Sequence, residues 1–407
     1  MKRFLLFSIA MVALLAQAQN KPYITKVYDF MPAPGQFVNN TPLYNDGEPR
    51  DSVIARASRA ICGYTTITSD EIEMPDGSIM TVNDTTITAK PGMISLGSFG
   101  GYVVFGFDHP VVNVDGEYDI QIFGNGFQAN NTTTSGGSSE PGIVMVSRDI
   151  NGNGIPDDPW YELAGSEYNN PKTQKHFTIT YYKPDDSQFG PLGMNQYHNQ
   201  YIRWTCNSVD SLQEGYIRKN YWHTQSYWPQ WVEGETLTFE GTKLPCNAVD
   251  ESGAGSYWVQ SFFDWGYVDN RSDEHYGYGN NASNISSENL NKGFKIEWAV
   301  DDDGNPVELK KIDFVKVYCA MLQDCGWIGE ESTEVCGAVD LHPNSVPEPE
   351  VVPGDVDGDG TVTAADITVL YNYLLNDDSC SLVNGDQDGD GSITAGDVTV
   401  VYNILLN

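Results

Sequence analysis

The chain has 407 residues, of which 22 are basic and 56 are acidic, so its formal net charge is -34. Nucleic acids and anionic membranes attract basic surfaces, and this charge balance therefore argues against both as partners. It favours neutral ligands or cations.

Residues 1–18 have the pattern of a secretory signal peptide. A basic start precedes an apolar run from Phe4 to Leu15, and small residues follow at Ala16 and Ala18. The run is too short and wrongly flanked for a membrane span, and no later stretch reaches the ~18 apolar residues that a span needs. The residue directly after the expected cleavage site is Gln19 and not the cysteine that would carry a lipid anchor. We therefore expect a secreted or cell-surface chain with neither a membrane span nor a lipid anchor.

The region 19–342 has the periodicity of short strands. Its strand-like runs are rich in β-branched and aromatic residues and are mostly bounded by Gly, Asn, Asp or Pro. They are Tyr102–Phe107, Tyr118–Phe123, Ile143–Val146, Phe177–Tyr182, Thr236–Phe239, Phe294–Trp298 and Phe314–Tyr318. Almost no ten-residue stretch has helical spacing. Many short strands with glycine-rich turns predict a mainly β fold, and we expect a jelly-roll β-sandwich that binds a ligand.

Three stretches of this region carry a family resemblance. They are SLGSFGGYVVFGFDHPVVNVDGEYDIQIFGNGF at 95–127, EPGIVMVSRDINGNGIPDDPWYELAGSEY at 140–168 and IDFVKVYCAMLQDCGWIGEESTEVCGAVDLH at 312–342. They resemble exported cell-surface proteins of gut Bacteroidetes, built on a jelly roll similar to carbohydrate-binding modules. The resemblance implies the fold rather than the ligand. Because some relatives lie beside vitamin B12 uptake proteins, cobalamin stays open as a nutrient ligand.

Residues Asp149–Asp157 read D-x-N-x-N-G-I-P-D, which resembles the calcium loops of thrombospondin type 3 repeats. Oxygen-bearing side chains stand at loop positions 1, 3, 5 and 9. They are Asp149, Asn151, Asn153 and Asp157. Position 12 is Trp160, so a closing carboxylate must come from Asp158 or Glu162. The alternative is an Asn-Gly turn between strands, which selects the same residue types.

Two aromatic clusters are candidates for a ligand platform, because sugar C–H faces lie against Trp and Tyr rings. The first comprises Tyr221, Trp222, His223, Tyr227, Trp228 and Trp231, and the second comprises Tyr257, Trp258, Phe262, Phe263, Trp265 and Tyr267. Most aromatics in strands belong to a core. Proline at 229 removes a ladder donor and suggests a loop or an edge. We therefore expect Trp228, Gln230 and Trp231 to be exposed and to bind the ligand.

A catalytic function is an open alternative. A glycoside hydrolase needs two carboxylates at a defined separation, and Asp264, Asp269 and Glu274 lie near the second aromatic cluster. With 56 acidic residues, such proximity also arises by chance. No nucleophile elbow, HExxH or Cys/His signature occurs. The sequence thus favours a non-catalytic binding protein, with glycans as the expected ligands, over a polysaccharide hydrolase or lyase, and it identifies no catalytic residue.

Residues 343–353, PNSVPEPEVVP, are dense in proline and acidic. Such a segment predicts a stiff, extended linker between the β domain and the residues that follow.

Residues 354–407 contain the same sequence motif twice, offset by 31 positions. The matched residues of the first copy are Asp355, Asp357, Asp359, Gly360, Thr361, Thr363 and Asp366, and those of the second are Asp386, Asp388, Asp390, Gly391, Ser392, Thr394 and Asp397. Calcium takes six to eight oxygens, and glycine at loop position 6 permits the sharp turn that brings them together. The sequence predicts one Ca²⁺ in each loop.

Each loop leads into a predicted helix whose apolar residues recur every three or four positions. Those of the first helix are Ile367, Leu370 and Leu374, and those of the second are Val398, Val401 and Leu405. This spacing places each trio on one helical face, so we expect the two helices to bury each other.

The duplicated loops and helices resemble a type I dockerin, the calcium-folded module that binds cohesin domains. The resemblance implies the calcium ligands Asp355, Asp357, Asp359, Thr361, Thr363 and Asp366 in one loop, and Asp386, Asp388, Asp390, Ser392, Thr394 and Asp397 in the other. It also implies a cohesin-like or surface scaffold partner. The positions that choose the cohesin in cellulosomal dockerins carry hydroxyl residues, whereas here they are Ala364, Ala365, Ala395 and Gly396.

Overall fold

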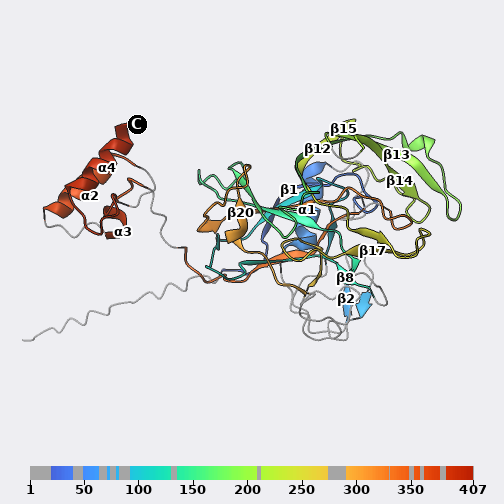
Figure 1. Cartoon of the computed structure of the whole chain (residues 1–407), viewed down its shortest axis with the longest axis horizontal. Helices are drawn as coiled ribbons and strands as arrows, with labels where there is room; N and C mark the ends of the chain where they lie inside the picture. Colours follow the sequence, from blue (N-terminus) through green and yellow to red (C-terminus); the bar gives the residue numbers. More distant parts are fainter. Residues whose placement is uncertain are drawn as a thin grey trace, which may run out of the picture. The chain divides into compact units, whose positions relative to one another are not determined.

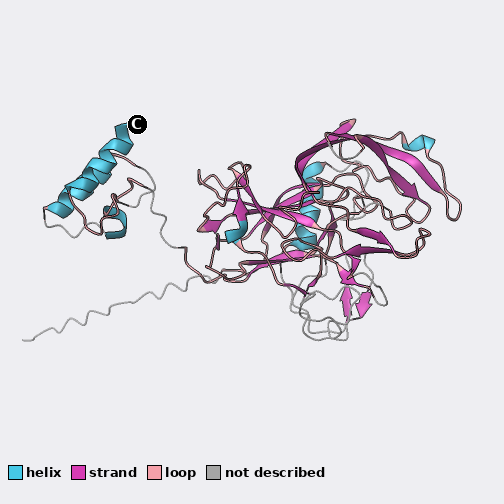
Figure 2. Ribbon diagram, viewed as in Figure 1, coloured by secondary structure: helices cyan, strands magenta, loops and turns pink. Residues whose placement is uncertain are grey.

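The computed structural model describes residues 20–39, 49–63, 71–73, 79–81, 92–129, 135–208, 212–273, 290–329, 331–347, 353–357, 362–375 and 382–406. The chain divides into two compact units, Met1–Ser345 and Val346–Asn407. Strands dominate the first unit and helices the second (Figure 2). The expected signal peptide at 1–18 lies outside the described residues, as does 348–352 of the expected linker.

The large unit is mainly β, as the sequence predicts. Its strands in the first half are β1 Lys26–Met31, β2 Glu71–Glu73, β3 Ile79–Thr81, β4 Ile94–Ser95, β5 Tyr102–Gly106, β6 Val111–Val112, β7 Ile120–Phe123, β8 Phe127–Gln128, β9 Gly136–Ser138, β10 Gly142–Ser147, β11 Trp160–Leu163 and β12 Gln174–Tyr182. Those in the second half are β13 Tyr197–Cys206, β14 Glu214–Asn220, β15 Thr236–Lys243, β16 Ala248–Asp250, β17 Trp258–Ser261, β18 Ser272–Asp273, β19 Leu290–Asn291, β20 Ala299–Val300, β21 Lys311–Ile312, β22 Phe314–Cys319, β23 Glu334–Val335 and β24 Gly337–Asp340.

A six-stranded antiparallel sheet forms the centre of the large unit, in the order β1-β5-β22-β10-β11-β20. Its central strands β5, β10 and β22 are almost continuously buried. Runs of Val, Ile and Phe at these positions suit a sheet that is covered on both faces.

A second antiparallel sheet has the order β14-β13-β12-β15, in which β15 returns to lie beside β12 (Figure 1). Three consecutive strands with the fourth beside the first make a Greek key. The buried residues of β12 alternate with more exposed ones, and its Tyr181 hydroxyl donates to the Phe99 carbonyl (3.0 Å). Phe177 meets the Phe99 ring edge to face (4.9 Å), and the Phe239 ring lies 6.5 Å from that of Tyr102 in β5. The two sheets therefore pack face to face.

Helix α1, Arg50–Ile61, lies against β1 and was not expected (Figure 1). Its buried residues are Val53, Ala57, Ala60 and Ile61, which have helical spacing. Two of the four are alanines, so the apolar face is narrow and gives a weak periodic signal. The expected strand at Phe294–Trp298 is also wrong. Its second half is a 3₁₀ turn, η4 Ile296–Trp298, and Phe294 forms only a bridge to Ile120.

The small unit contains three helices in its described residues: α2 Ala364–Leu374, α3 Leu382–Gly385 and α4 Ala395–Leu406. Helices α2 and α4 contact each other around a core of Val356, Ile367, Leu370, Val398 and Val401. The mutual burial of the two predicted helices is confirmed for four of the six expected residues. Leu374 and Leu405, at the helix ends, are 39% and 37% exposed.

Candidate metal centres

The second duplicated loop is closed by backbone hydrogen bonds to its own carboxylates. The amides of Asp390 and Gly391 donate to the two oxygens of Asp386 (3.1 and 2.8 Å), and the amide of Ser392 donates to Asp390 Oδ1 (2.9 Å). Gly389 and Gly391 have φ of +75° and +89°. This backbone turns the carboxylates of Asp386, Asp388 and Asp390 inward, with one oxygen of each within 4.8 Å of the others.

The carboxylate at loop position 12 connects each loop to its helix. Oδ1 of Asp397 accepts the amides of Gln387 and Asp388 (2.6 and 3.0 Å), and Oδ2 accepts that of Thr394 (2.6 Å). The side chain is fully buried. Burial acts to raise its pKa, but these amide donors outweigh it and hold the pKa below the usual value. Asp397 is therefore set up to remain a carboxylate.

The first loop repeats this arrangement 31 residues earlier. Asp366 Oδ1 accepts the amides of Val356 and Asp357 (2.7 and 3.1 Å), and Oδ2 accepts that of Thr363 (2.7 Å), which completes a capping box at the start of α2. Oxygens of Asp355, Asp357 and Asp366 lie within 4.8 Å of one another. Asp359 and Thr361, two expected ligands, lie outside the described residues. The donors that are described are hard oxygens in a tight turn, and such a set fits Ca²⁺.

The loop at 149–157 has the same internal bonding as the second duplicated loop. The amides of Asn153 and Gly154 donate to the two oxygens of Asp149 (3.0 and 2.8 Å), and that of Ile155 donates to Asn153 Oδ1 (2.7 Å). Glycines at loop positions 4 and 6, Gly152 and Gly154, again have φ near +70°. The side-chain amides of Asn151 and Asn153 donate to the Asp157 carboxylate, so this carboxylate is already hydrogen-bonded within the loop.

Of the two candidates for closing this loop, only one lies beside it. Asp158 Oδ2 accepts the amide of Ile150 (3.0 Å). Glu162 instead accepts the hydroxyl of Thr242 on β15 (2.6 Å). A calcium ion at 149–157 remains a prediction.

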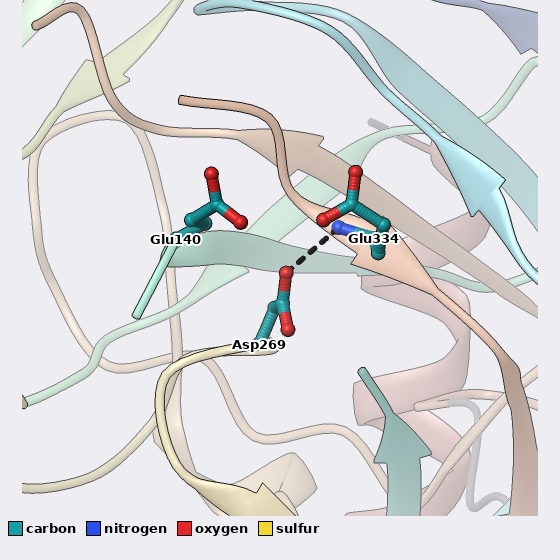
Figure 3. Close-up of side chains that lie close together, drawn as sticks. All are labelled: Glu140, Asp269 and Glu334. Atoms are coloured by element: carbon teal, nitrogen blue, oxygen red, sulfur yellow. Dashed lines mark hydrogen bonds between the residues drawn. The ribbon is translucent and has the colours of Figure 1, made fainter. Parts of the chain in front are cut away.

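A third group of carboxylates was not expected as a group. Glu140 precedes β10, Asp269 follows β17 and Glu334 begins β23, and one oxygen of each lies within 4.8 Å of the others (Figure 3). We call these three residues the carboxylate trio. Asp269 and Glu334 are buried, whereas Glu140 is partly exposed. No local sequence motif predicts the trio, because its members are far apart in the sequence and come together only when the sheets fold.

Backbone contacts hold the trio in place. The amide of Glu334 donates to Asp269 Oδ2 (2.9 Å; Figure 3). The amide of Asn125 donates to Oδ1 of the same carboxylate (2.7 Å). Asp269 has φ of +57°. A Cβ atom at Gly124 would lie 2.6 Å from Asp269 Oδ1, so glycine is required for this approach. The amide of Ser332 donates to Glu140 Oε1 (3.2 Å), and the Ser95 hydroxyl donates to Glu334 (2.8 Å).

The charges in this site are poorly compensated. Burial, followed by the charges of Glu334, Asp269 and Glu331, raises the pKa of Glu140 well above its usual value. Burial and the charge of Asp269 do the same to the pKa of Glu334, and burial raises the pKa of Asp269 to about 7 despite its amide donors. Adjacent buried carboxylates must therefore hold protons or a cation.

The expected ligand platform around Pro229 is wrong. Trp228 is fully buried and Trp231 is only 8% exposed, and Trp231 stacks on Phe30 (6.1 Å). Asn39 ties the segment down, since its amide donates to the Trp228 carbonyl and its Oδ1 accepts the amide of Gln230 (2.8 and 3.0 Å). Pro229 thus lies in a loop that Asn39 holds in place by hydrogen bonds, and the Trp228 and Trp231 rings of this loop belong to the core. The Gln230 side chain is exposed, but it bonds to its own loop at Ser226 (2.9 Å).

The exposed tryptophans lie elsewhere. Trp222, Trp265 and Trp327 are 59%, 45% and 45% exposed. Trp265 lies against Trp298 with ring centroids 4.6 Å apart, and Trp298 meets Tyr118 edge to face at 6.1 Å. We call Tyr118, Trp298 and Trp265 the aromatic row. Of the residues suggested for catalysis, Asp264 is exposed beside this row, Asp269 belongs to the trio and Glu274 lies outside the described residues.

Comparison with known families gives one result. The family model of the dockerin type I domain matches residues 353–406. The chain's C-terminal module is therefore similar to type I dockerins, which bind calcium and are typically extracellular or at the cell surface, and the match supports attachment to a cohesin partner. No curated protein matches the chain. In the described part of the chain, no helix has the length and apolarity to cross a membrane.

Proposed function

We propose that the chain is an exported, non-catalytic glycan-binding protein that a calcium-folded, dockerin-like module attaches to a cohesin partner. The observation that carries the proposal is the duplication in the small unit, where two loops 31 residues apart make equivalent amide bonds to Asp366 and Asp397. In this proposal the loop carboxylates and Thr361, Thr363, Ser392 and Thr394 supply the calcium oxygens. The large unit, which we propose to be a jelly-roll variant, supplies the ligand site; its Greek-key sheet supports that proposal.

The aromatic row is the ligand site that the described residues favour. Trp265 is 45% exposed and neighbours the exposed carboxylate of Asp264. At the other end, Lys295 lies 5.5 Å from the centre of the Tyr118 ring and pairs with Glu297 (3.1 Å). Adjoining rings offer an apolar surface for sugar C–H groups, and the flanking charged groups can orient hydroxyls.

The catalytic alternative gains no support from the carboxylate trio. A glycosidase pair must reach both sides of a glycosidic bond. Asp269 and Glu334 are only 1% and 4% exposed, and both are occupied by backbone and serine donors. A polysaccharide chain would therefore have no access to them in this structure.

Calorimetry with a panel of polysaccharides and with cobalamin tests the ligand proposal. We expect a glycan to bind and Trp265→Ala to weaken it by about 1–3 kcal/mol, as for loss of a hot-spot aromatic. Trp327→Ala, which removes an equally exposed ring outside the row, is the control. If cobalamin binds and no polysaccharide does, the ligand of the large unit is a nutrient and not a glycan. Equal glycan affinity in Trp265→Ala and the wild type would exclude the aromatic row.

A further inference from the structure

The carboxylate trio joins three segments that are distant in the sequence. Asp269 is 65 residues before Glu334, and Glu140 bonds through its backbone to Thr333, 193 residues later. The side chains converge from β23, from the start of β10 and from the loop after β17 (Figure 3). A ligand held between the three would therefore cross-link much of the large unit.

Two residues that neighbour the trio each have a buried side-chain oxygen with no hydrogen-bond donor among the described residues. The first is Oε2 of Glu331, a residue that is 1% exposed and whose charge acts on Glu140. The other oxygen of Glu331 already accepts from Gln323 and from the Cys325 thiol. The second is the amide carbonyl Oδ1 of Asn125, whose backbone amide contacts Asp269. A buried acceptor without a donor is costly unless a cation completes it.

We propose that Glu140, Asp269 and Glu334 bind a hard divalent cation, Ca²⁺ by its chemistry, in the large unit. All available donors are oxygens, and no His or Cys belongs to the trio, which disfavours zinc. Calcium accepts irregular geometry and six to eight oxygens, so amide, hydroxyl and water oxygens can complete the shell.

The ion would neutralise the mutual repulsion of the trio and fasten β23 to β10 and to the loop after β17. This site is separate from the duplicated loops, because it lies in the other compact unit. It also does not depend on which ligand the large unit binds.

Calcium counting on the full chain tests the proposal. After chelation and re-equilibration with CaCl₂, we expect the Glu140→Gln/Glu334→Gln variant to retain one Ca²⁺ fewer per chain than the wild type. The matched control is Glu233→Gln/Glu240→Gln, which changes two exposed glutamates in the same way and should keep the wild-type count. An unchanged count in the trio variant would overturn the proposal. If the calcium count is unchanged and the trio variant also melts at a higher temperature than the wild type, the three carboxyl groups hold protons and not a cation.

A second measurement covers the case in which the trio variant does not fold. Crystals of the wild-type chain soaked with Tb³⁺, a calcium substitute, should give an anomalous peak between the three carboxylates. Peaks at the duplicated loops without one at the trio would overturn the proposal.

Discussion

Glu162 on β11 is a carboxyl whose environment opposes its charge. Burial raises its pKa from 4.5 to about 7, although the Thr242 hydroxyl and Lys175 act to lower it. Because the folded state binds this proton more tightly than the unfolded chain, the group stabilises the fold fully only below about pH 4.5. That contribution is lost as the pH rises through about 7.

We predict that Glu162→Gln reduces the loss of stability with rising pH. A pKa of about 7 in place of 4.5 corresponds to roughly 3 kcal/mol, so the variant should be relatively more stable at pH 8 than at pH 5 by up to that amount. Thermal melts of both proteins across this range measure the difference. The exposed substitution Glu240→Gln serves as the control. Parallel pH profiles for the wild type and Glu162→Gln would contradict the prediction.

Trp228 shows why local sequence mispredicts a side chain's environment. The polar neighbours and Pro229 suggested a surface loop, but Asn39, far away in the sequence, fixes the loop and turns the ring inward. We predict that Trp228→Ala destabilises the large unit by about 3–5 kcal/mol, the cost of emptying a buried aromatic site. Trp222→Ala, at a 59% exposed ring, should change stability by less than about 0.5 kcal/mol. Equal melting temperatures for the two variants would contradict the burial of Trp228.

At the scale of elements, Asp397 serves both a loop and a helix. Its two oxygens accept three backbone amides, those of Gln387 and Asp388 in the loop and that of Thr394 just before α4, and the side chain is fully buried. We predict that Asp397→Asn removes one bound calcium and lowers the melting temperature of the small unit, because the amide offers one acceptor oxygen in place of two. Asp302→Asn, at an exposed site of the large unit, should change neither quantity. Full calcium occupancy in Asp397→Asn would show that the residue only caps the helix.

The sequence predicted the elements whose signals are local. A 31-residue repeat places every loop carboxylate at a fixed distance from its glycine, so the loops and the facing residues Leu370 and Val401 could be found without a structure. The β-branched and aromatic run Phe177–Tyr182 likewise predicted a strand, which lies within β12. The narrow alanine face of α1 gave too weak a signal. The carboxylate trio could not be predicted, because its members approach only after two sheets and their loops have formed.

At the scale of the whole molecule, the chain has two compact units with a boundary between Ser345 and Val346. We predict that a protease site introduced at 346–352 can be cut without changing the melting temperature of the large unit, since few contacts cross such a boundary. Differential scanning calorimetry before and after cleavage makes the comparison. A lower melting temperature after cleavage would mean that the small unit stabilises the large one.

The central claim is that calcium folds the C-terminal module through its two loops. The most direct measurement is a calcium titration of the chelated full chain, followed by calorimetry and far-ultraviolet circular dichroism, for the wild type and for Asp355→Ala/Asp386→Ala. Carboxylates gathered without a cation repel one another, so helix formation should accompany ion binding. We expect the wild type to gain helical signal on adding calcium, and the double variant to bind two ions fewer and gain none. Equal calcium uptake and equal helical signal in the two proteins would contradict the account.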